Sequence, residues 1–153
     1  MQTHERDLAG LRHAIDQARI GRDEGGVPIG GALIADDGTV LALGHNRRVQ
    51  QNSAIRHGET DALENDGRLP ASVYRRSTMY TTLSPCDMCT GAILLYGIPR
   101  VVMGENRTFV GGEDYLRQRG VEVVNLDSQE CVDLMDEFIA AHPEIWNEDI
   151  GEE

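Results

Sequence analysis

The chain has 153 residues, of which 40% are hydrophobic and 26% are charged. These proportions are typical of a globular protein that is long enough to bury one sizeable core. The formal net charge is −12 at pH 7, which argues against a nucleic-acid partner because a phosphate backbone repels an acidic surface. No apolar run reaches the length of a membrane span and the first residues are polar, so we expect neither a membrane partner nor a signal peptide.

The predicted elements begin with a helix over residues 5–23, where apolar side chains recur near helical period and Gly25-Gly26 ends the pattern. Two short apolar runs joined by an Asp-Gly turn then indicate a β-hairpin. In chain order the remaining predictions are strands over 30–35 and 40–44, a helix over 57–64, a strand over 78–83, a helix over 85–96, a strand over 100–104, a helix over 113–119, a strand over 121–126, and helices over 128–141 and 144–150.

The order of these elements predicts the fold class. Strands that alternate with helices in the second half indicate parallel crossovers, and the early hairpin adds an antiparallel edge. We therefore expect an α/β fold, a three-layer α-β-α sandwich with a mixed five-stranded sheet, in a single domain over residues 1–153. The glycine-rich segment 25–31 lacks the Lys-Ser/Thr of a phosphate-binding loop, so we expect it to serve tight packing near the site.

The stretch 81–92 contains two of the three cysteines in a C-x-x-C motif. Cys86 and Cys89 are three residues apart, so both sulfurs face the same way on a helix. Ser84 is the predicted N-cap of that helix and Pro85 its first residue. The positive end of a helix favours the thiolate, which is the form that binds metal. An odd number of cysteines with this spacing fits metal chemistry in a reducing compartment better than a disulfide framework.

His57 is the candidate third ligand. One imidazole and two thiolates form a donor set that suits zinc, and three protein ligands leave a fourth position for water, as in catalytic sites. Zinc lowers the pKa of such a water toward neutrality. Glu59 follows His57 by two residues and is the candidate acid–base group over that water.

Competing interpretations of these residues stay open. The C-x-x-C motif also occurs in redox pairs, which leaves His57 and Glu59 without a role, and in structural zinc sites, which need a fourth ligand. Cys131 is the remaining cysteine, and we expect it in the core because it lies on the apolar stripe of the helix over 128–141. A zinc-stabilised binding module would keep the three ligands without needing Glu59.

These motifs carry a family resemblance. The pattern H-x-E followed by P-C-x-x-C is the signature of the zinc nucleobase deaminases. The chain resembles the cytidine and deoxycytidylate deaminase superfamily and, within it, the fungal cytosine deaminases, from about residue 15 to the end. The segments that carry the resemblance, besides the signature, are 25–31, 44–46, 80–93, 96–100 and 146–152.

The resemblance implies a cytidine deaminase-like fold and a cytoplasmic homodimer with one zinc ion per subunit. It also implies hydrolysis of free cytosine to uracil and ammonia in pyrimidine salvage, with Glu59 moving the protons. Base recognition is implied at Asn46 and Asp149, at the Gly58 backbone N–H, and at Phe109 and Trp146 against the ring, with residues 143–153 as a lid.

Each of these residues also has a simpler explanation: a turn for Asn46, core packing for Phe109, an anchor for the last helix at Trp146, and a solvated acidic end for Asp149. The loop 107–112 departs from the fungal pattern, so related aminoheterocycles such as isocytosine, guanine or creatinine stay open as substrates. A tRNA adenosine deaminase shares the signature, but we expect basic flanks in such an enzyme, and this tail is acidic.

Overall fold

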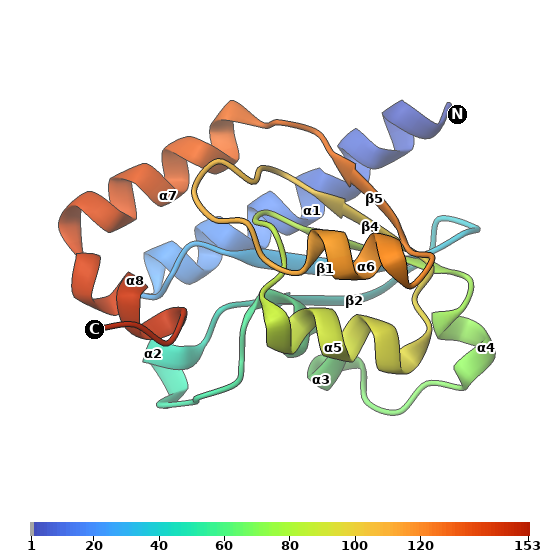
Figure 1. Cartoon of the computed structure of the whole chain (residues 1–153), viewed down its shortest axis with the longest axis horizontal. Helices are drawn as coiled ribbons and strands as arrows, with labels where there is room; N and C mark the ends of the chain where they lie inside the picture. The colour runs from blue at the N-terminus through green and yellow to red at the C-terminus, as the bar shows by residue number, and fades with distance from the viewer. Residues whose placement is uncertain (1) are drawn as a thin grey trace.

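The computed structural model describes residues 2–153, so residue 1 of the predicted domain lies outside the described part. A five-stranded sheet with the order β2-β1-β3-β4-β5 runs through the molecule (Figure 1). Strand β1 is antiparallel to both of its neighbours, whereas β3, β4 and β5 are parallel. The mixed sheet with an antiparallel hairpin at one edge is therefore confirmed. The strands are β1 (Gly30–Ala35), β2 (Val40–His45), β3 (Ser77–Thr81), β4 (Arg100–Met103) and β5 (Glu122–Asn125).

Helices cover both faces of the sheet, as predicted. One face carries α1 (Thr3–Asp23) and α7 (Gln129–Ala141), and the other carries α3 (Gly58–Asp66), α5 (Asp87–Tyr96) and α6 (Glu113–Gln118). None of the described helices combines the length and apolar character that crossing a lipid bilayer requires. The remaining helices are α2 (Arg48–Gln51), α4 (Ala71–Tyr74) and α8 (Pro143–Asp149).

The central strands are buried on both faces. Met79 and Val101 point into the apolar cluster under α3, α5 and α6, whereas their neighbours Tyr80 and Val102 point into the cluster under α1 and α7. Successive strand residues face opposite sides of a sheet, so a strand covered on both faces is buried at every position, as β3 is. The threonines of β3 are buried together with its apolar residues, and the run of β-forming residues is the pattern that predicted this strand.

Two adjacent glycines set the spacing between the three layers. A Cβ atom at Gly30 would lie 1.9 Å from the carbonyl oxygen of Ala14 in α1. A Cβ atom at Gly31 would lie 2.7 Å from the carbonyl oxygen of Gly58, the first residue of α3. Because successive residues face opposite sides, this pair lets one helix approach β1 closely from each face. The predicted tight packing of residues 25–31 near the site is confirmed at these two positions.

The start of α5 differs from the prediction. The helix begins at Asp87 with Cys86 as its N-cap, so the assignment of Ser84 as N-cap was wrong. The Ser84 hydroxyl instead donates a hydrogen bond to Glu113 (2.6 Å) and accepts one from the Gly111 N–H (2.9 Å). A serine hydroxyl can form alternative local hydrogen bonds, and here its partners are the first residue of α6 and the loop before that helix.

Candidate metal centre and its pocket

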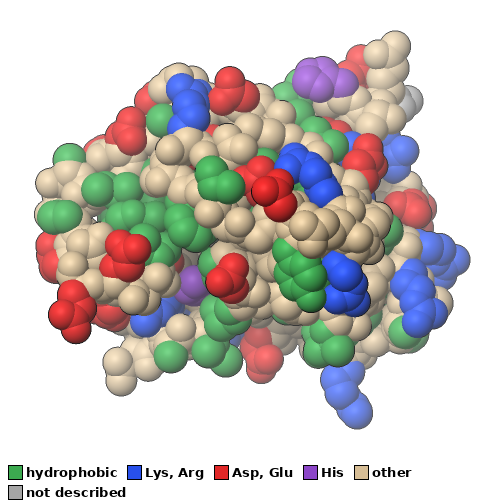
Figure 2. All heavy atoms as spheres, in the orientation of Figure 1, with side chains coloured by type: hydrophobic (Ala, Val, Ile, Leu, Met, Phe, Trp, Pro, Cys, Tyr) green, Lys and Arg blue, Asp and Glu red, His purple; other side chains and the backbone are tan. Residues whose placement is uncertain are grey.

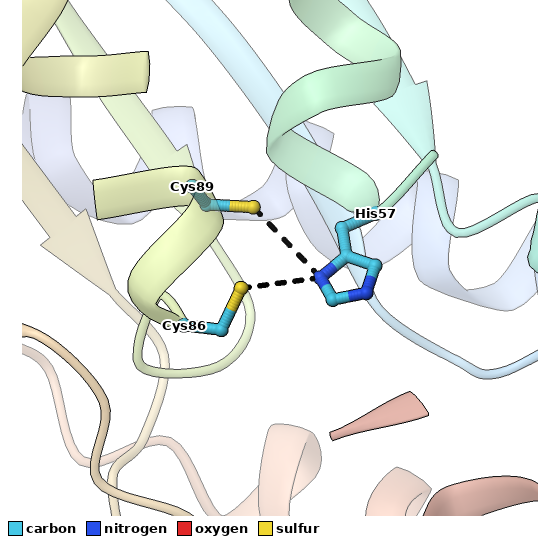
Figure 3. A group of neighbouring side chains, drawn as sticks. All are labelled: His57, Cys86 and Cys89. Carbon is cyan, nitrogen blue, oxygen red and sulfur yellow. Dashed lines mark hydrogen bonds between the residues drawn. The ribbon is translucent and has the colours of Figure 1, made fainter. Parts of the chain in front are cut away.

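Three predicted ligands converge at the ends of two helices. His57 precedes α3, and Cys86 and Cys89 lie at the N-terminus of α5 (Figure 3). Their ligand atoms all lie within 4.8 Å of one another. The Nδ1 atom of His57 is 3.4 Å from Sγ of Cys86 and 3.8 Å from Sγ of Cys89. Tetrahedral zinc with ordinary bond lengths separates a nitrogen from a sulfur ligand by about 3.5 Å, so the donor set fits zinc.

The two thiols differ in their ionisation. Hydrogen bonds from Cys89 and His57 lower the pKa of Cys86 to about 4. The hydrogen bond that Cys89 donates to Cys86, together with burial, raises the pKa of Cys89 well above its usual value. The thiolate expected at this helix end is therefore held at Cys86. Since cysteine and histidine bind metal in their deprotonated forms, metal binding displaces the protons that these groups share.

A fourth protein ligand is missing from this group in residues 2–153. Cys131, which a closed structural site would have needed, is 1% exposed and packs in the apolar cluster between the sheet and α1 and α7. Its predicted place in the core is confirmed. The donor set thus leaves one tetrahedral position for a non-protein ligand, which is the arrangement of catalytic rather than structural zinc.

Glu59 faces the same pocket as the candidate ligands. Its side chain lines a small pocket together with His57 and Cys86, and its Oε1 atom accepts a hydrogen bond from the Thr81 hydroxyl. Burial and then the negative charge of Cys86 raise the pKa of Glu59. A carboxyl group with a raised pKa is suited to carry a proton in either direction near neutral pH.

Aromatic side chains from two distant segments line the pocket. Phe109 and Trp146 meet edge to face, with ring centroids 6.1 Å apart and planes at 84°. Trp146 belongs to an apolar cluster that packs α7 and α8 onto the body, and Figure 2 shows hydrophobic side chains gathered around these two helices. With Phe109, Trp146 and Asp149 in place as the roof of the pocket, the free volume of about 20 Å³ is roughly that of one water molecule.

Asn46 and Asp149 form a buried pair beside the pocket. The Asn46 amide donates a 2.7 Å hydrogen bond to Oδ1 of Asp149, whose Oδ2 is 3.7 Å from Nε2 of His57. Asp149 lines the free volume, whereas Asn46 lies behind it. Gly58 also lies outside the lining and packs against Ile29 and Gly30. The structure therefore places Glu59, Phe109, Trp146 and Asp149 at the pocket and the other two substrate-binding candidates just behind it.

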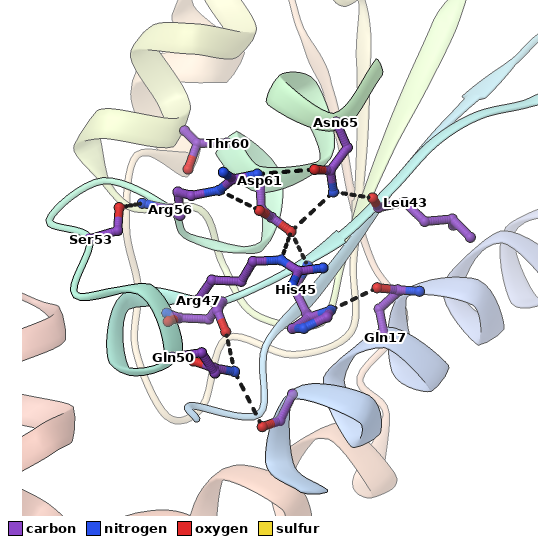
Figure 4. Close-up of polar contacts among 12 residues, drawn as sticks. Gln17, Leu43, His45, Arg47, Gln50, Ser53, Arg56, Thr60, Asp61 and Asn65 are labelled. Atoms are coloured by element: carbon purple, nitrogen blue, oxygen red, sulfur yellow. Dashed lines mark hydrogen bonds and ion pairs between the residues drawn. The ribbon is translucent and has the colours of Figure 1, made fainter. Parts of the chain in front are cut away.

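A buried carboxylate anchors the segment that carries Asn46. Asp61 of α3 is 0% exposed and accepts hydrogen bonds from Nε of Arg47 (2.9 Å), from Nε of Arg56 (2.7 Å) and from the backbone of His45 (3.0 Å) (Figure 4). Although burial raises the pKa of Asp61, the hydrogen bonds from Arg47, His45 and Arg56 outweigh it and hold that pKa below its usual range. Segment 45–56 is thereby fixed to the helix that presents Glu59.

The sequence did not indicate three residues that contribute to the site. Thr81 orients Glu59, Asp61 anchors the Asn46 segment, and Ile150 lines the pocket from the end of α8. Thr81 gave one usable signal, because a threonine at the end of a buried strand leading into the cysteine motif is well placed to contact the site. Asp61 and Ile150 contact residues that are distant in sequence, so no local sequence pattern indicated their roles.

Residues 4–105 match the family described as the cytidine and deoxycytidylate deaminase zinc-binding region. The chain belongs to this family. The match spans the candidate ligands His57, Cys86 and Cys89, and it confirms zinc as the predicted cofactor. Members of this family are zinc-dependent deaminases, so the chain is an enzyme of the predicted class.

Three similar proteins show how far the likeness extends. The chain is 62% identical over 146 residues to a cytosine deaminase of Candida albicans, covering 95% of this chain and 97% of that protein. It is 36% identical over 110 residues to a tRNA-specific adenosine deaminase of Streptococcus pyogenes, covering 71% and 68% of the two chains. The fold matches the structure of a guanine deaminase from Nitrosomonas europaea with a TM-score of 0.72 at 23% identity, covering 86% and 84%.

Proposed function

We propose that this enzyme hydrolyses free cytosine to uracil and ammonia in pyrimidine salvage. The observation that carries the proposal is a three-ligand zinc donor set that shares a small pocket with a buried glutamate. The likeness to the Candida albicans cytosine deaminase over almost the full length of both chains supports the substrate. The acidic net charge supports a small base rather than tRNA.

His57, Cys86 and Cys89 would hold the zinc ion. Bound zinc supplies a Lewis acid that makes a water molecule nucleophilic near neutral pH. In the overall reaction, water adds to C4 of cytosine, the exocyclic amine leaves as ammonia, and the ring becomes that of uracil.

Glu59 moves the protons in this proposal. Its carboxyl group takes one proton from the attacking water and delivers it to N3 of the ring, then takes the remaining proton of the added hydroxyl and delivers it to the departing amine. Burial and the hydrogen bond from Thr81 hold it in one place, and its raised pKa keeps the protonated form accessible. A leaving amine needs an acid within reach, and Glu59 lines the pocket beside the donor set.

Base recognition is proposed for the residues around Asp149. The Asp149 carboxylate accepts from N1–H, the Asn46 amide and the Gly58 N–H bind the pyrimidine edge and O2, and Phe109 and Trp146 contact the ring. Support comes from the hydrogen bond between Asn46 and Asp149 and from the aromatic pair over the pocket. A buried acceptor that matches one ring N–H discriminates strongly against bases that lack it.

Residues 143–153 are proposed to act as a lid within a single catalytic domain. The pocket has room for about one water molecule with Trp146, Asp149 and Ile150 in place. A pyrimidine base therefore enters only after α8 and the Phe109 loop move apart. Closure after entry excludes water from the reacting base, and the need to reopen makes product release a candidate for the slow step.

A homodimer is proposed through the face formed by α3, α4 and α5. A groove of about 990 Å³ runs along this face and is lined by apolar side chains that include Ile55, Leu95 and Tyr96. Leu95 is 76% exposed and Ile55 is 62% exposed, which is unusual for large apolar residues that share one face. Replacement of Leu95 by Glu should give a monomer in sedimentation velocity, and a wild-type monomer at micromolar concentration would contradict the dimer. The free cysteines fit the reducing cytoplasm.

An ammonia-release assay tests the activity. Free bases (cytosine, isocytosine, guanine), creatinine, and the nucleosides cytidine and adenosine should be compared, each with and without a zinc chelator. We expect chelator-sensitive release from cytosine, and release from another compound alone would replace the substrate.

Replacement of Glu59 by glutamine tests its role in proton transfer. Glu59→Gln should lower kcat by about a thousandfold while zinc content by atomic absorption stays unchanged. The matched control is Glu137→Gln on the exposed side of α7, which should leave kcat unchanged. Normal ammonia release by the Glu59 variant would remove Glu59 from the proton transfers.

A further inference from the structure

The last helix is tied to the body by polar contacts from one short segment. Asn46 and Arg48 both reach α8, and Arg48 is the only arginine whose ion pairs extend to that helix within residues 2–153. Its Nη1 atom is 3.3 Å from Oε1 of Glu148 and 3.9 Å from Oδ1 of Asp149. Arg48 therefore contacts the helix at the residue that faces the pocket and at the residue before it.

The Arg48 side chain is itself held in place. Its Nε atom donates a 3.1 Å hydrogen bond to the carbonyl oxygen of Ala54, and its backbone N–H donates to the side-chain oxygen of Asn46. The side chain is 14% exposed, whereas that of Glu148 is 71% exposed. An arginine that is packed along its length and fixed at Nε presents its remaining N–H groups in one direction.

The surrounding segment is also fixed. Arg47 and Arg56, on either side of the turn that carries Arg48, both donate to the buried carboxylate of Asp61 in α3 (Figure 4). Motion of α8 relative to the body therefore changes the distance from Arg48 to Glu148 and Asp149 rather than the position of Arg48. A fixed cation opposite a movable acidic helix favours the closed arrangement.

We propose that Arg48 is a positioning residue that holds α8 closed and fixes the Asp149 carboxylate for the bound base. Arg48 does not line the pocket and acts through Asp149 and Glu148. The inference rests on the proposed function for its link to base binding. Its effect on α8 itself does not depend on any substrate.

The proposal separates binding from chemistry. Loss of the guanidinium lets α8 open more often, so the base meets a less ordered carboxylate, whereas Glu59 and the zinc ligands are unchanged. A partly buried ion pair next to a second carboxylate contributes a factor of about three to ten. We expect Arg48→Gln to raise KM for cytosine and Kd for uracil by about this factor, with kcat changed less than twofold.

The test uses the zinc-loaded full-length protein and four variants. Arg48→Gln removes the cation, Arg48→Lys keeps the charge, and Glu148→Gln removes one partner. Arg12→Gln is the matched control, because Arg12 joins α1 to α7 through Glu130 far from the pocket. The readouts are KM and kcat for cytosine, Kd for uracil by calorimetry, thermal unfolding, and hydrogen exchange of the α8 amides without ligand.

Support requires a specific set of results. In Arg48→Gln the α8 amides should exchange hydrogen faster than in wild type, and KM for cytosine and Kd for uracil should rise. The thermal unfolding temperature should stay as close to that of wild type as it does in Arg12→Gln. Arg48→Lys recovers most of the affinity, and the double variant with Glu148→Gln is less impaired than the product of the single effects. Unchanged α8 exchange, or losses of stability, zinc and kcat together, overturns the proposal.

Hydrogen exchange of α8 also distinguishes a failure of the Arg48 proposal from a failure of the proposed cytosine deamination. If the wild-type enzyme releases no ammonia from cytosine, the proposed function fails, and faster α8 exchange in Arg48→Gln still supports the positioning of the helix. If wild type is active and Arg48→Gln matches it in every readout, the function stands and the role of Arg48 is removed.

Discussion

The metal centre and the roof of the pocket are built in contrasting ways. The three zinc ligands come from two short motifs at helix ends, and the sheet and the glycines of β1 fix those helices. The roof joins Phe109 to Trp146 and Asp149 of α8, and it is held by an aromatic contact, by the apolar cluster around Trp146 and by polar contacts to the body. We propose that the chemistry depends on the first region and base recognition on the second, so variants should affect them separately.

The largest effect is expected at the metal centre. Cys89→Ser removes a thiolate ligand, so zinc content should fall below stoichiometry and ammonia release should drop by more than about a thousandfold. Atomic absorption and the ammonia assay measure both. Cys131→Ser, in the core, should keep zinc at one per chain. If Cys131→Ser loses zinc and Cys89→Ser retains it, the donor set is wrong.

Removal of the roof should separate the two regions most clearly. A chain that ends at His142 lacks Trp146 and Asp149, so activity should fall at least about a hundredfold because the base loses its partners and its shield from water. Zinc should stay bound. A chain that ends at Gly151 lacks only two exposed residues and should remain active. Normal turnover by the shorter chain would refute the lid.

A single roof residue should have a smaller effect. Asp149→Asn keeps the size of the side chain but removes the anionic acceptor, so kcat/KM for cytosine should fall about a hundredfold with zinc retained. Glu144→Gln is the control, because Glu144 lies exposed on the same helix and pairs only with His142 among the described residues. Equal kcat/KM values for the two variants would remove Asp149 from base recognition.

The smallest effect concerns stability rather than catalysis. Asp61→Asn should lower the free energy of unfolding by about 2 kcal/mol at pH 7, because two arginines lose their shared carboxylate. The folded-state pKa of Asp61 lies below its usual value, so its stabilisation is present above about pH 4. That stabilisation is lost as the pH falls through the folded pKa.

Urea unfolding from pH 7 to pH 3 measures this difference. The gap between wild type and Asp61→Asn should narrow toward pH 3, whereas Asp136→Asn, at an exposed position of α7, should follow wild type throughout. A gap that widens on acidification would show that Asp61 is not the stabilising anion.

The same contrast explains what could be predicted from the sequence. The strands and longer helices follow from apolar periodicity, and the donor set follows from spacing, because each of these signals is local. The single turns α2 and α4 were missed because four residues carry no usable period. Ser84 was placed wrongly because its partner Glu113 lies far along the chain. Asp149 was singled out only by family resemblance, since its link to Asn46 exists only in the folded chain.

The absence of a side chain at Gly31 has a consequence for engineering this enzyme. The gap there is narrower than a methyl group, because an added Cβ atom would come within 2.7 Å of the Gly58 carbonyl oxygen. Even alanine would act as a wedge that lifts the start of α3, and with it His57 and Glu59, away from the cysteines on α5. Libraries meant to broaden substrate range should therefore leave this position unchanged, although it touches neither metal nor base.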